Sequence, residues 1–200
     1  MASGPQTGNR AADPTPAAAW PLRWAIALIL LSASANAQSG AATEYQVKAA
    51  FLYNFAKFVE WPPDTFPRPS APLHLCVFGD DPFEGELERI VREKTIGGRP
   101  LRVLQPKRAG QARGCHILFV GSSDPKEVRS LLEVLRGSST LTVGNSSEFT
   151  RLGGMINFLV EGGRVRFEIN PEAAQENRLR ISAKLLSLAR IARNDGPGGG

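Results

Sequence analysis

The sequence is short of the residues and motifs that most often carry out chemistry. It has two histidines, two cysteines and two tyrosines among 200 residues, and no Gly-x-Gly-x-x-Gly or Gly-x4-Gly-Lys-Ser/Thr run. The common dinucleotide and phosphate loops are therefore excluded. Both histidines lie in apolar runs and away from the serines, so a serine hydrolase is not indicated. The composition favours a binding protein over an enzyme, and we expect no cofactor.

The N-terminal apolar run is too short to span a membrane. Residues 24–31 fall well below the roughly 20 apolar residues that a transmembrane helix needs. Arg10 and Arg23 precede this run, and Ala35-Asn36-Ala37 follows it with the small-x-small pattern of a signal peptidase site. We expect a signal peptide over residues 1–37 and a periplasmic location. A tethered anchor or a cytosolic helix is the alternative.

Basic residues outnumber acidic ones, but they do not form a stripe. The chain has 24 Lys and Arg against 19 Asp and Glu, for a net charge of +5. The densest basic group is Arg99, Arg102, Lys107, Arg108 and Arg113, and no aromatic residue interrupts it. A nucleic-acid groove normally needs a basic stripe on one face of the protein. We therefore expect no nucleic-acid partner.

Cys76 and Cys115 each lie in a short apolar run that is typical of a buried strand. Exported proteins form disulfides, and the side chains of neighbouring strands can meet at disulfide distance, so we expect a disulfide. Free buried thiols are one alternative, and a Cys2His2 metal site with His74 and His116 is another. Against the metal site, His116 points away from the adjacent Cys115, and the usual ligand spacings are missing. We expect no metal.

Apolar strand, glycine, polar cap and helix recur along the middle of the chain. Strands are expected at 73–78, 99–105, 115–120 and 141–143, with a loop at 106–114 and helices up to Glu93, Leu135 and Leu152. This alternation is typical of a parallel sheet covered by helices. The expected fold class is α/β, a Rossmann-like three-layer sandwich, in one domain over residues 38–193.

The two ends of this domain depart from the alternation. A helix is expected over 44–61, with positions 47, 51, 55, 58 and 59 on its apolar face and Leu52 outside it. Gly162-Gly163 between segments 155–160 and 164–170 predicts an antiparallel hairpin. A last helix is expected over 171–193, before a disordered tail at 194–200. Its core face would carry Leu179, Ile181, Leu185, Leu188 and Ile191.

Polar residues follow three of the expected strands. Asp80, Ser122 and Asn145 each come directly after, or next to, the glycine that ends a strand. In open parallel sheets, ligands bind beyond the carboxyl ends of the strands. These three residues are candidates for ligand binding. The alternative is that they cap the helices that follow them.

Six segments, in this order, carry a resemblance to a known family: 45–62, 75–83, 115–120, 153–158, 164–170 and 179–189. They resemble the opening signature YQVKAAFLYNFAKFVEWP and the later blocks of the YfiR family. The resemblance implies a Rossmann-like fold and a non-enzymatic regulatory role. YfiR-like proteins bind the periplasmic part of an inner-membrane diguanylate cyclase and hold it inactive, and an outer-membrane lipoprotein sequesters them. Cys76 and Cys115 sit where the family's disulfide cysteines lie, whereas the second cysteine pair of YfiR is absent here.

A binding protein needs an interface, and exposed apolar patches usually mark one. The candidate residues are Tyr53, Phe55, Phe58 and Trp61, the hairpin face with Arg166 and Glu168, and the Arg180/Lys184 edge of the last helix. The aromatic residues could instead belong to the core, and the charges to a solvated face. Besides the cyclase, the alternatives are another membrane receptor such as a histidine kinase, a small molecule, and a second copy of the chain.

Overall fold

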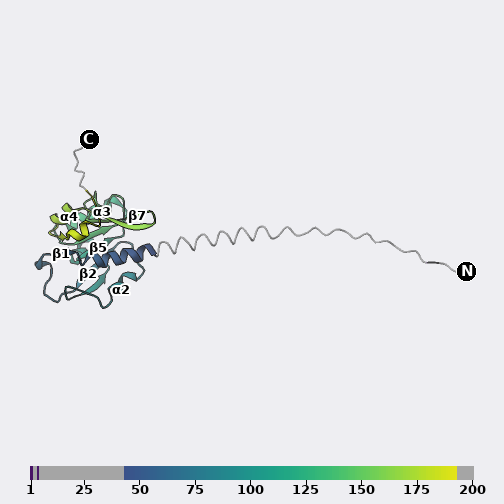
Figure 1. Cartoon of the computed structure of the whole chain (residues 1–200), viewed down its shortest axis with the longest axis horizontal. Coiled ribbons are helices and arrows are strands. Elements are labelled where there is room, and N and C mark those ends of the chain that lie inside the picture. The colour runs from purple at the N-terminus through teal and green to yellow at the C-terminus, as the bar shows by residue number, and fades with distance from the viewer. Residues whose placement is uncertain (2–3, 5–42, 193–200) are drawn as a thin grey trace, which may run out of the picture. The chain divides into compact units, whose positions relative to one another are not determined.

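The first described helix covers residues 43–55 of the computed structural model, which describes residues 1, 4 and 43–192 (Figure 1). We call it the N-terminal helix. Its prediction was partly wrong, because the chain turns at 56–58 and Val59–Glu60 then form strand β1. The predicted apolar face was also rotated: Leu52 is buried, and Val47 is 40% exposed. The stripe that the sheet covers runs through positions 48, 52 and 55, at helical spacing.

Strands β1 and β9 pair in a separate two-stranded sheet, and the other strands build one large mixed sheet. Their bounds are β2 Leu73–Phe78, β3 Thr95–Ile96, β4 Arg99–Leu104, β5 Ile117–Val120, β6 Leu141–Gly144, β7 Ile156–Glu161, β8 Arg164–Ile169, β9 Arg180–Ile181 and β10 Arg190–Ile191. The order across the large sheet is β10-β8-β7-β6-β5-β2-β4-β3.

The centre of this sheet is parallel, and both of its flanks contain antiparallel pairs. Strands β4, β2, β5, β6 and β7 run parallel to one another. Strand β8 forms the predicted hairpin with β7, and β3 pairs antiparallel with β4. The mixed α/β class and the mostly parallel sheet are therefore confirmed. Strand order reverses between β2 and β5, because the chain returns from β4 to the other side of β2.

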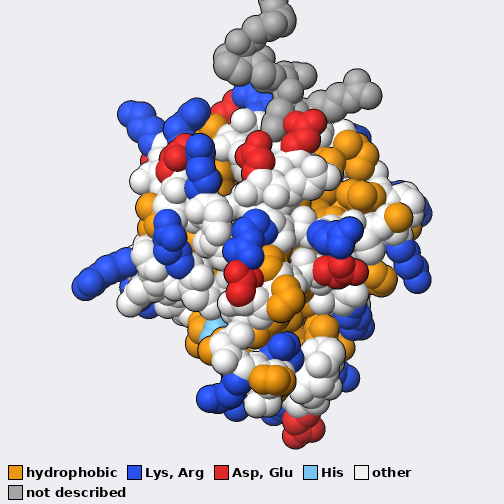
Figure 2. Space-filling view, turned by 90° about the vertical axis from the view of Figure 1, so that its left-hand side faces the viewer, with side chains coloured by type: hydrophobic (Ala, Val, Ile, Leu, Met, Phe, Trp, Pro, Cys, Tyr) orange, Lys and Arg blue, Asp and Glu red, His pale blue; other side chains and the backbone are white. Residues whose placement is uncertain are grey.

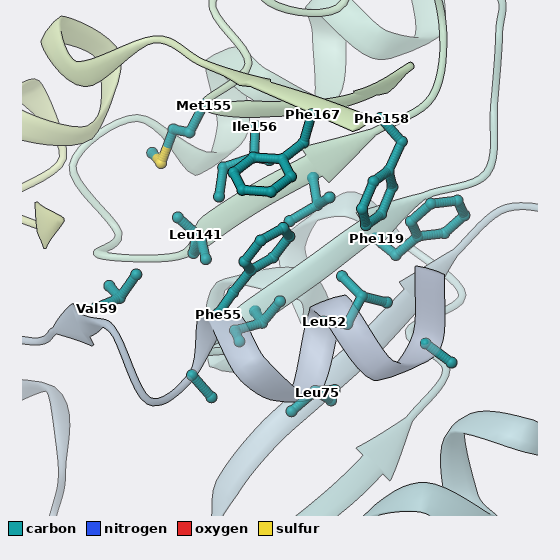
Figure 3. Packing of buried hydrophobic residues seen from close by; sticks show 14 of the residues in the cluster. Leu52, Phe55, Val59, Leu75, Phe119, Leu141, Met155, Ile156, Phe158 and Phe167 are labelled. Atoms are coloured by element: carbon teal, nitrogen blue, oxygen red, sulfur yellow. The ribbon is translucent and has the colours of Figure 1, made fainter. Parts of the chain in front are cut away.

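Helices cover both faces of the sheet. Their bounds are α2 Glu86–Val91, α3 Pro125–Leu135, α4 Pro171–Glu176 and α5 Ala183–Leu186, with 3-10 helices η1 Pro63–Thr65 and η2 Ala109–Gly114. The N-terminal helix, α2, α4 and α5 contribute to the larger core cluster, and α3 and η2 to the smaller one. Figure 3 shows Phe55 pointing from the N-terminal helix toward Phe158 and Phe167 of the sheet.

The predicted last helix over 171–193 is wrong. The chain instead forms α4, β9, α5 and β10 in succession. Arg178 adopts a left-handed φ of 62°, which an α-helix cannot contain, and Ser182 caps a new helix through its side chain. Of the predicted core face, Leu179 and Leu185 are buried, Ile181 is half-buried, and Leu188 and Ile191 are exposed.

Other differences are local. Residues 146–153 form bends and turns rather than the predicted helix, with three-residue backbone bonds such as that from the N–H of Phe149 to the carbonyl of Ser146, and Gly153 has a left-handed φ of 101°. The predicted loop at 106–114 contains η2, and Cys115 lies just before β5 rather than inside it. The predicted signal peptide, its cleavage site and the predicted tail lie outside the described residues. Within the described part of the chain, no helix is long and apolar enough to cross a membrane.

Candidate functional site

Cys76 and Cys115 form the predicted disulfide, with Cα atoms 5.9 Å apart. Cys76 belongs to β2, and Cys115 joins the end of η2 to the neighbouring strand β5. Both residues are buried and pack with Ala112 and Leu118 in the smaller core cluster. Burial keeps reductants and thiol reagents away from the sulfur atoms, so this position is typical of a structural disulfide.

The two histidines lie beside the disulfide and contact each other. The backbone N–H of His74 donates to Nδ1 of His116 over 3.1 Å. Nδ1 of the His74 ring lies 3.0 Å from the carbonyl oxygen of Gly114. Among the described residues, no group of three His, Cys, Asp or Glu side chains is placed to hold a metal ion.

His116 is neutral at ordinary pH because of where its ring lies. The ring stacks on Phe66 with centroids 4.5 Å apart, and His116 is only 6% exposed. This burial, together with the nearby charges of His74 and Arg99, lowers the pKa of His116 to about 4. Its Nε2 atom is buried without a hydrogen-bond partner in the described part of the chain.

Two of the predicted partner-binding regions meet on one surface. Strands β1 and β9 pair antiparallel, which places Glu60 opposite Arg180. The backbone N–H of Ser182 donates to the carbonyl of Phe58 over 2.9 Å, and Nζ of Lys184 lies 5.5 Å from the centroid of the Phe58 ring. We call Phe58, Glu60, Arg180 and Lys184 the β1–β9 surface. Figure 2 looks at the side where Figure 1 labels β1, and there Lys and Arg side chains are scattered over the surface, with hydrophobic patches near some of them.

A cavity of about 310 Å³ adjoins the β1–β9 surface through their shared residue, Arg180. Most of its lining is apolar: Pro171, Ala174, Gln175, Leu179, Arg180, Ile181 and Leu186. Its volume is at the lower end of the roughly 300–1,000 Å³ that is usual for small-molecule pockets. A single protruding side chain of a partner protein fits its size.

The other aromatic candidates differ in exposure. Phe55 is fully buried, with its ring centroid 5.2 Å from that of Phe167, so it belongs to the core and cannot contact a partner of the folded protein. Tyr53 is half-buried, and Nζ of Lys57 lies 4.1 Å from its ring centroid. Trp61 is also half-buried, but its indole N–H is enclosed and has no acceptor among the described residues.

The two candidates on the hairpin face differ in their contacts with the rest of the described protein. Arg166 is exposed and has no ion-pair partner in the described part of the chain. The carboxylate of Glu168 accepts hydrogen bonds from the hydroxyl of Thr150 over 2.8 Å and from Nδ2 of Asn157 over 3.3 Å. Glu168 therefore stabilises the hairpin against the preceding turn, which leaves Arg166 for a partner.

The three candidate ligand-binding residues lie at the same edge of the sheet, and each contacts other parts of the protein there. Oγ of Ser122 accepts the backbone N–H of Asp124, and Nδ2 of Asn145 donates to the hydroxyl of Tyr45. Asp80 is exposed, and its backbone carbonyl lies directly against Gly121, between the ends of β2 and β5. Backbone atoms therefore occupy the point where strand order reverses, which is the usual ligand crevice of such sheets.

A family model described as YfiR/HmsC-like matches residues 45–190. The chain belongs to the YfiR/HmsC-like family. This match confirms the resemblance seen in the sequence, and it spans the disulfide, both histidines, the hairpin and the β1–β9 surface. The family is regulatory rather than catalytic. The surfaces that could hold a partner are therefore of more interest than the edge of the sheet.

In this YfiR/HmsC-like domain, sequence reasoning missed a buried polar cluster on the N-terminal helix. Lys48 is 3% exposed and forms an ion pair with Glu44 over 2.5 Å, and its Nζ lies 4.6 Å from the centroid of the Tyr45 ring. Burial, and then the charge of Glu44, raise the pKa of Tyr45. The i,i+4 spacing of Glu44 and Lys48 was the only signal in the sequence.

Proposed function

We propose that this protein binds the periplasmic part of a membrane-embedded diguanylate cyclase and holds the enzyme inactive. The observation that carries the proposal is the YfiR/HmsC-like match over residues 45–190. Membership of this family implies a periplasmic regulator of a diguanylate cyclase. An outer-membrane lipoprotein that competes for the repressor would release the cyclase.

The disulfide supports export. Such bonds persist in oxidising compartments such as the periplasm and are rare in the cytosol. Cys76 and Cys115 are the only cysteines of the chain, and they are paired with each other. The N-terminal apolar run and the Ala35-Asn36-Ala37 sequence are consistent with the same compartment.

The β1–β9 surface is the interface that we favour for the cyclase. It combines a half-buried aromatic ring, Phe58, with two exposed cations, Arg180 and Lys184. Aromatic and arginine side chains are the residues that most often dominate the energy of a protein interface. The adjoining cavity of about 310 Å³ offers a socket for a side chain of the partner.

The first experiment is genetic. Deleting the gene is expected to raise cellular cyclic di-GMP. Expression of the wild-type protein from a plasmid is expected to return cyclic di-GMP to its wild-type level. With the double variant Arg180→Glu/Lys184→Glu, cyclic di-GMP is expected to stay high, because two reversed charges oppose docking. The matched control is Lys126→Glu/Arg129→Glu, which reverses two exposed charges of α3, outside the β1–β9 surface and the hairpin face, and is expected to complement.

The second experiment identifies the partner. A tagged protein is purified from solubilised membranes, and the proteins bound to it are identified. Recovery of a diguanylate cyclase supports the proposal. Unchanged cyclic di-GMP on deletion, with recovery of a histidine kinase or no membrane protein, would overturn it.

A further inference from the structure

The surface around η2 carries four exposed cations that have no acidic partner. They are Arg102 of β4 together with Lys107, Arg108 and Arg113, and we call them the basic patch. Residues 94–114 contain no Asp or Glu. Glu88 and Glu93 line a pocket with Arg102, and Asp81 accepts a hydrogen bond from Gln105, but none of these three forms an ion pair with the four cations. The ion pairs of the described residues involve six other cations, namely Lys48, Arg89, Arg136, Arg151, Arg178 and Arg190.

Arg99, in the same segment, differs from these four cations because its side chain makes contacts within the protein. Its guanidinium lies 3.7 Å from the centroid of the Phe66 ring, and its Nη1 donates to the carbonyls of Arg68 and Ala71 over 3.0 and 3.1 Å. None of the basic-patch side chains has such a hydrogen bond or ring contact within the described residues. Their charges are therefore available to an external anion.

The fold brings the two ends of the basic patch together. Arg102 pairs with His74 across β4 and β2, and Nδ1 of His74 lies 3.0 Å from the carbonyl oxygen of Gly114. His74 therefore lies between Arg102 and the end of η2 that carries Arg113, although ten residues separate these two arginines in the sequence. The disulfide at Cys115 ties this end of η2 to β2, so the arrangement is held in place.

An exposed leucine lies among these cations. Leu104 is 43% exposed and pairs with Cys76 across β4 and β2. Because alternate residues of a strand share a face, Leu104 lies on the same face of β4 as Arg102. The surface thus combines one apolar side chain with four long, flexible cations. Residues 94–114 contain no aromatic side chain, the usual anchor of a protein interface.

We propose that the basic patch holds the protein against an anionic phospholipid surface. Several unpaired cations around one aliphatic side chain suit a plane of phosphate headgroups, where many weak attractions add up. Arginine can also anchor a protein interface, but such interfaces are usually rich in aromatic residues at their centre, and this segment has none. The proposal rests on the proposed function only for the choice of membrane, which would be the one that contains the cyclase. Attachment there would raise the local concentration of the protein around its partner.

The test measures co-sedimentation of the purified protein, isolated from the periplasmic fraction, with lipid vesicles. Vesicles of phosphatidylcholine mixed with phosphatidylglycerol are compared with vesicles of phosphatidylcholine alone. We expect binding to the anionic vesicles only, and its loss at high salt, because salt screens exposed charges. Equal binding to both kinds of vesicle would show apolar insertion instead of charge attraction, and that result or binding to neither would overturn the proposal.

A matched pair of variants locates the binding surface. The triple variant Arg102→Gln/Arg108→Gln/Arg113→Gln is expected to bind anionic vesicles at least tenfold more weakly. The control Arg164→Gln/Arg166→Gln/Arg180→Gln loses the same net charge and is expected to bind like the wild type. Equal loss in both variants would mean that only net charge matters, and would overturn the assignment to the basic patch.

The variants also separate this proposal from the repressor proposal. In detergent, the basic-patch variant is expected to capture the membrane partner as the wild type does, because no lipid surface is needed there. Loss of capture in detergent, with vesicle binding unchanged, would assign the basic patch to an acidic protein partner instead of lipid. Failure to find any cyclase would leave the vesicle result standing.

Discussion

The backbone N–H of His74 donates a hydrogen bond to Nδ1 of His116 over 3.1 Å. Because Nδ1 is the acceptor, the neutral His116 ring must carry its proton on Nε2. That nitrogen is buried without a hydrogen-bond partner among the described residues. A second proton on the ring would therefore break the bond to His74 and place a charge beside Phe66.

This geometry predicts loss of stability in acid. The pKa of His116 is lowered from 6.5 to about 4 in the folded protein. The unfolded chain then binds the proton first as the pH falls, so the free energy of unfolding falls progressively from about pH 6.5 to pH 4. The expected loss from this residue is about 3 kcal/mol. Urea unfolding at several pH values measures it.

The control for the acid prediction is His116→Gln, which keeps an acceptor but cannot take up a proton in this range. Its unfolding free energy should depend less on pH than that of the wild type. His74→Gln should weaken the dependence only in part, because burial, the largest cause of the lowered pKa of His116, remains. An NMR titration of His116 gives its pKa directly, and a value near 6.5 would contradict the prediction.

Removing the disulfide should destabilise the protein without changing its fold. The bond joins residues that are 39 positions apart, and closing a loop of this length contributes about 4 kcal/mol in the chain-entropy model. We expect Cys76→Ala/Cys115→Ala to lower the free energy of unfolding by about this amount, measured in urea. Reductant present during urea unfolding should destabilise the wild type equally, because unfolding exposes the sulfur atoms, and it should leave the double variant unaffected. No difference between the two proteins would contradict the chain-entropy estimate for this loop.

Phe55→Ala should be costly because Phe55 belongs to the core. The residue is fully buried, and its ring packs against those of Phe158 and Phe167, with centroids 5.8 and 5.2 Å away. Truncating such a ring costs about 3–5 kcal/mol of folding free energy. Leu188→Ala, at a side chain that is 67% exposed, should change stability by about 0.5 kcal/mol or less. A stable Phe55→Ala that no longer represses would instead assign Phe55 to the interface.

Gly121→Ala should disturb the contact between the loops that follow β2 and β5. A Cβ at Gly121 would overlap the backbone carbonyl of Asp80, which cannot move aside as a flexible side chain does. We expect a loss of about 1–3 kcal/mol, measured by urea unfolding. Gly110→Ala is the matched control, because nothing lies within 4 Å of its Cβ position. Equal stability of the two variants would show that the loops separate easily.

The elements that were predicted correctly have a strong local pattern. Strands β2 and β5 are short apolar runs followed by glycine, and α3 follows an Asp-Pro cap. The hairpin of β7 and β8 has two glycines at its turn and alternating burial along β8. Each pattern lies within about ten neighbouring residues, and such patterns depend on periodicity and turn chemistry rather than on distant contacts.

The candidate site was predicted only in part. Phe58, Arg180 and Lys184 were each singled out, but nothing in the sequence indicated that they share a surface. Their contact depends on the pairing of β1 with β9, which joins residues 120 positions apart, such as Glu60 and Arg180. The predicted helices over 44–61 and 171–193 concealed this pairing, because both segments have helix-like spacing of apolar residues.

By itself, the sequence determined the family, the α/β class, the cysteine pair and the central strands, since these follow from motifs and from local apolar periodicity. The tertiary structure decided where the two long amphipathic segments stop being helical. Strands of two residues, such as β1, β9 and β10, have no local signal. They form because a distant backbone satisfies their hydrogen bonds. The tertiary structure also decided that Phe55 is buried while Phe58 stays close to Lys184, because burial depends on which elements pack against each side chain.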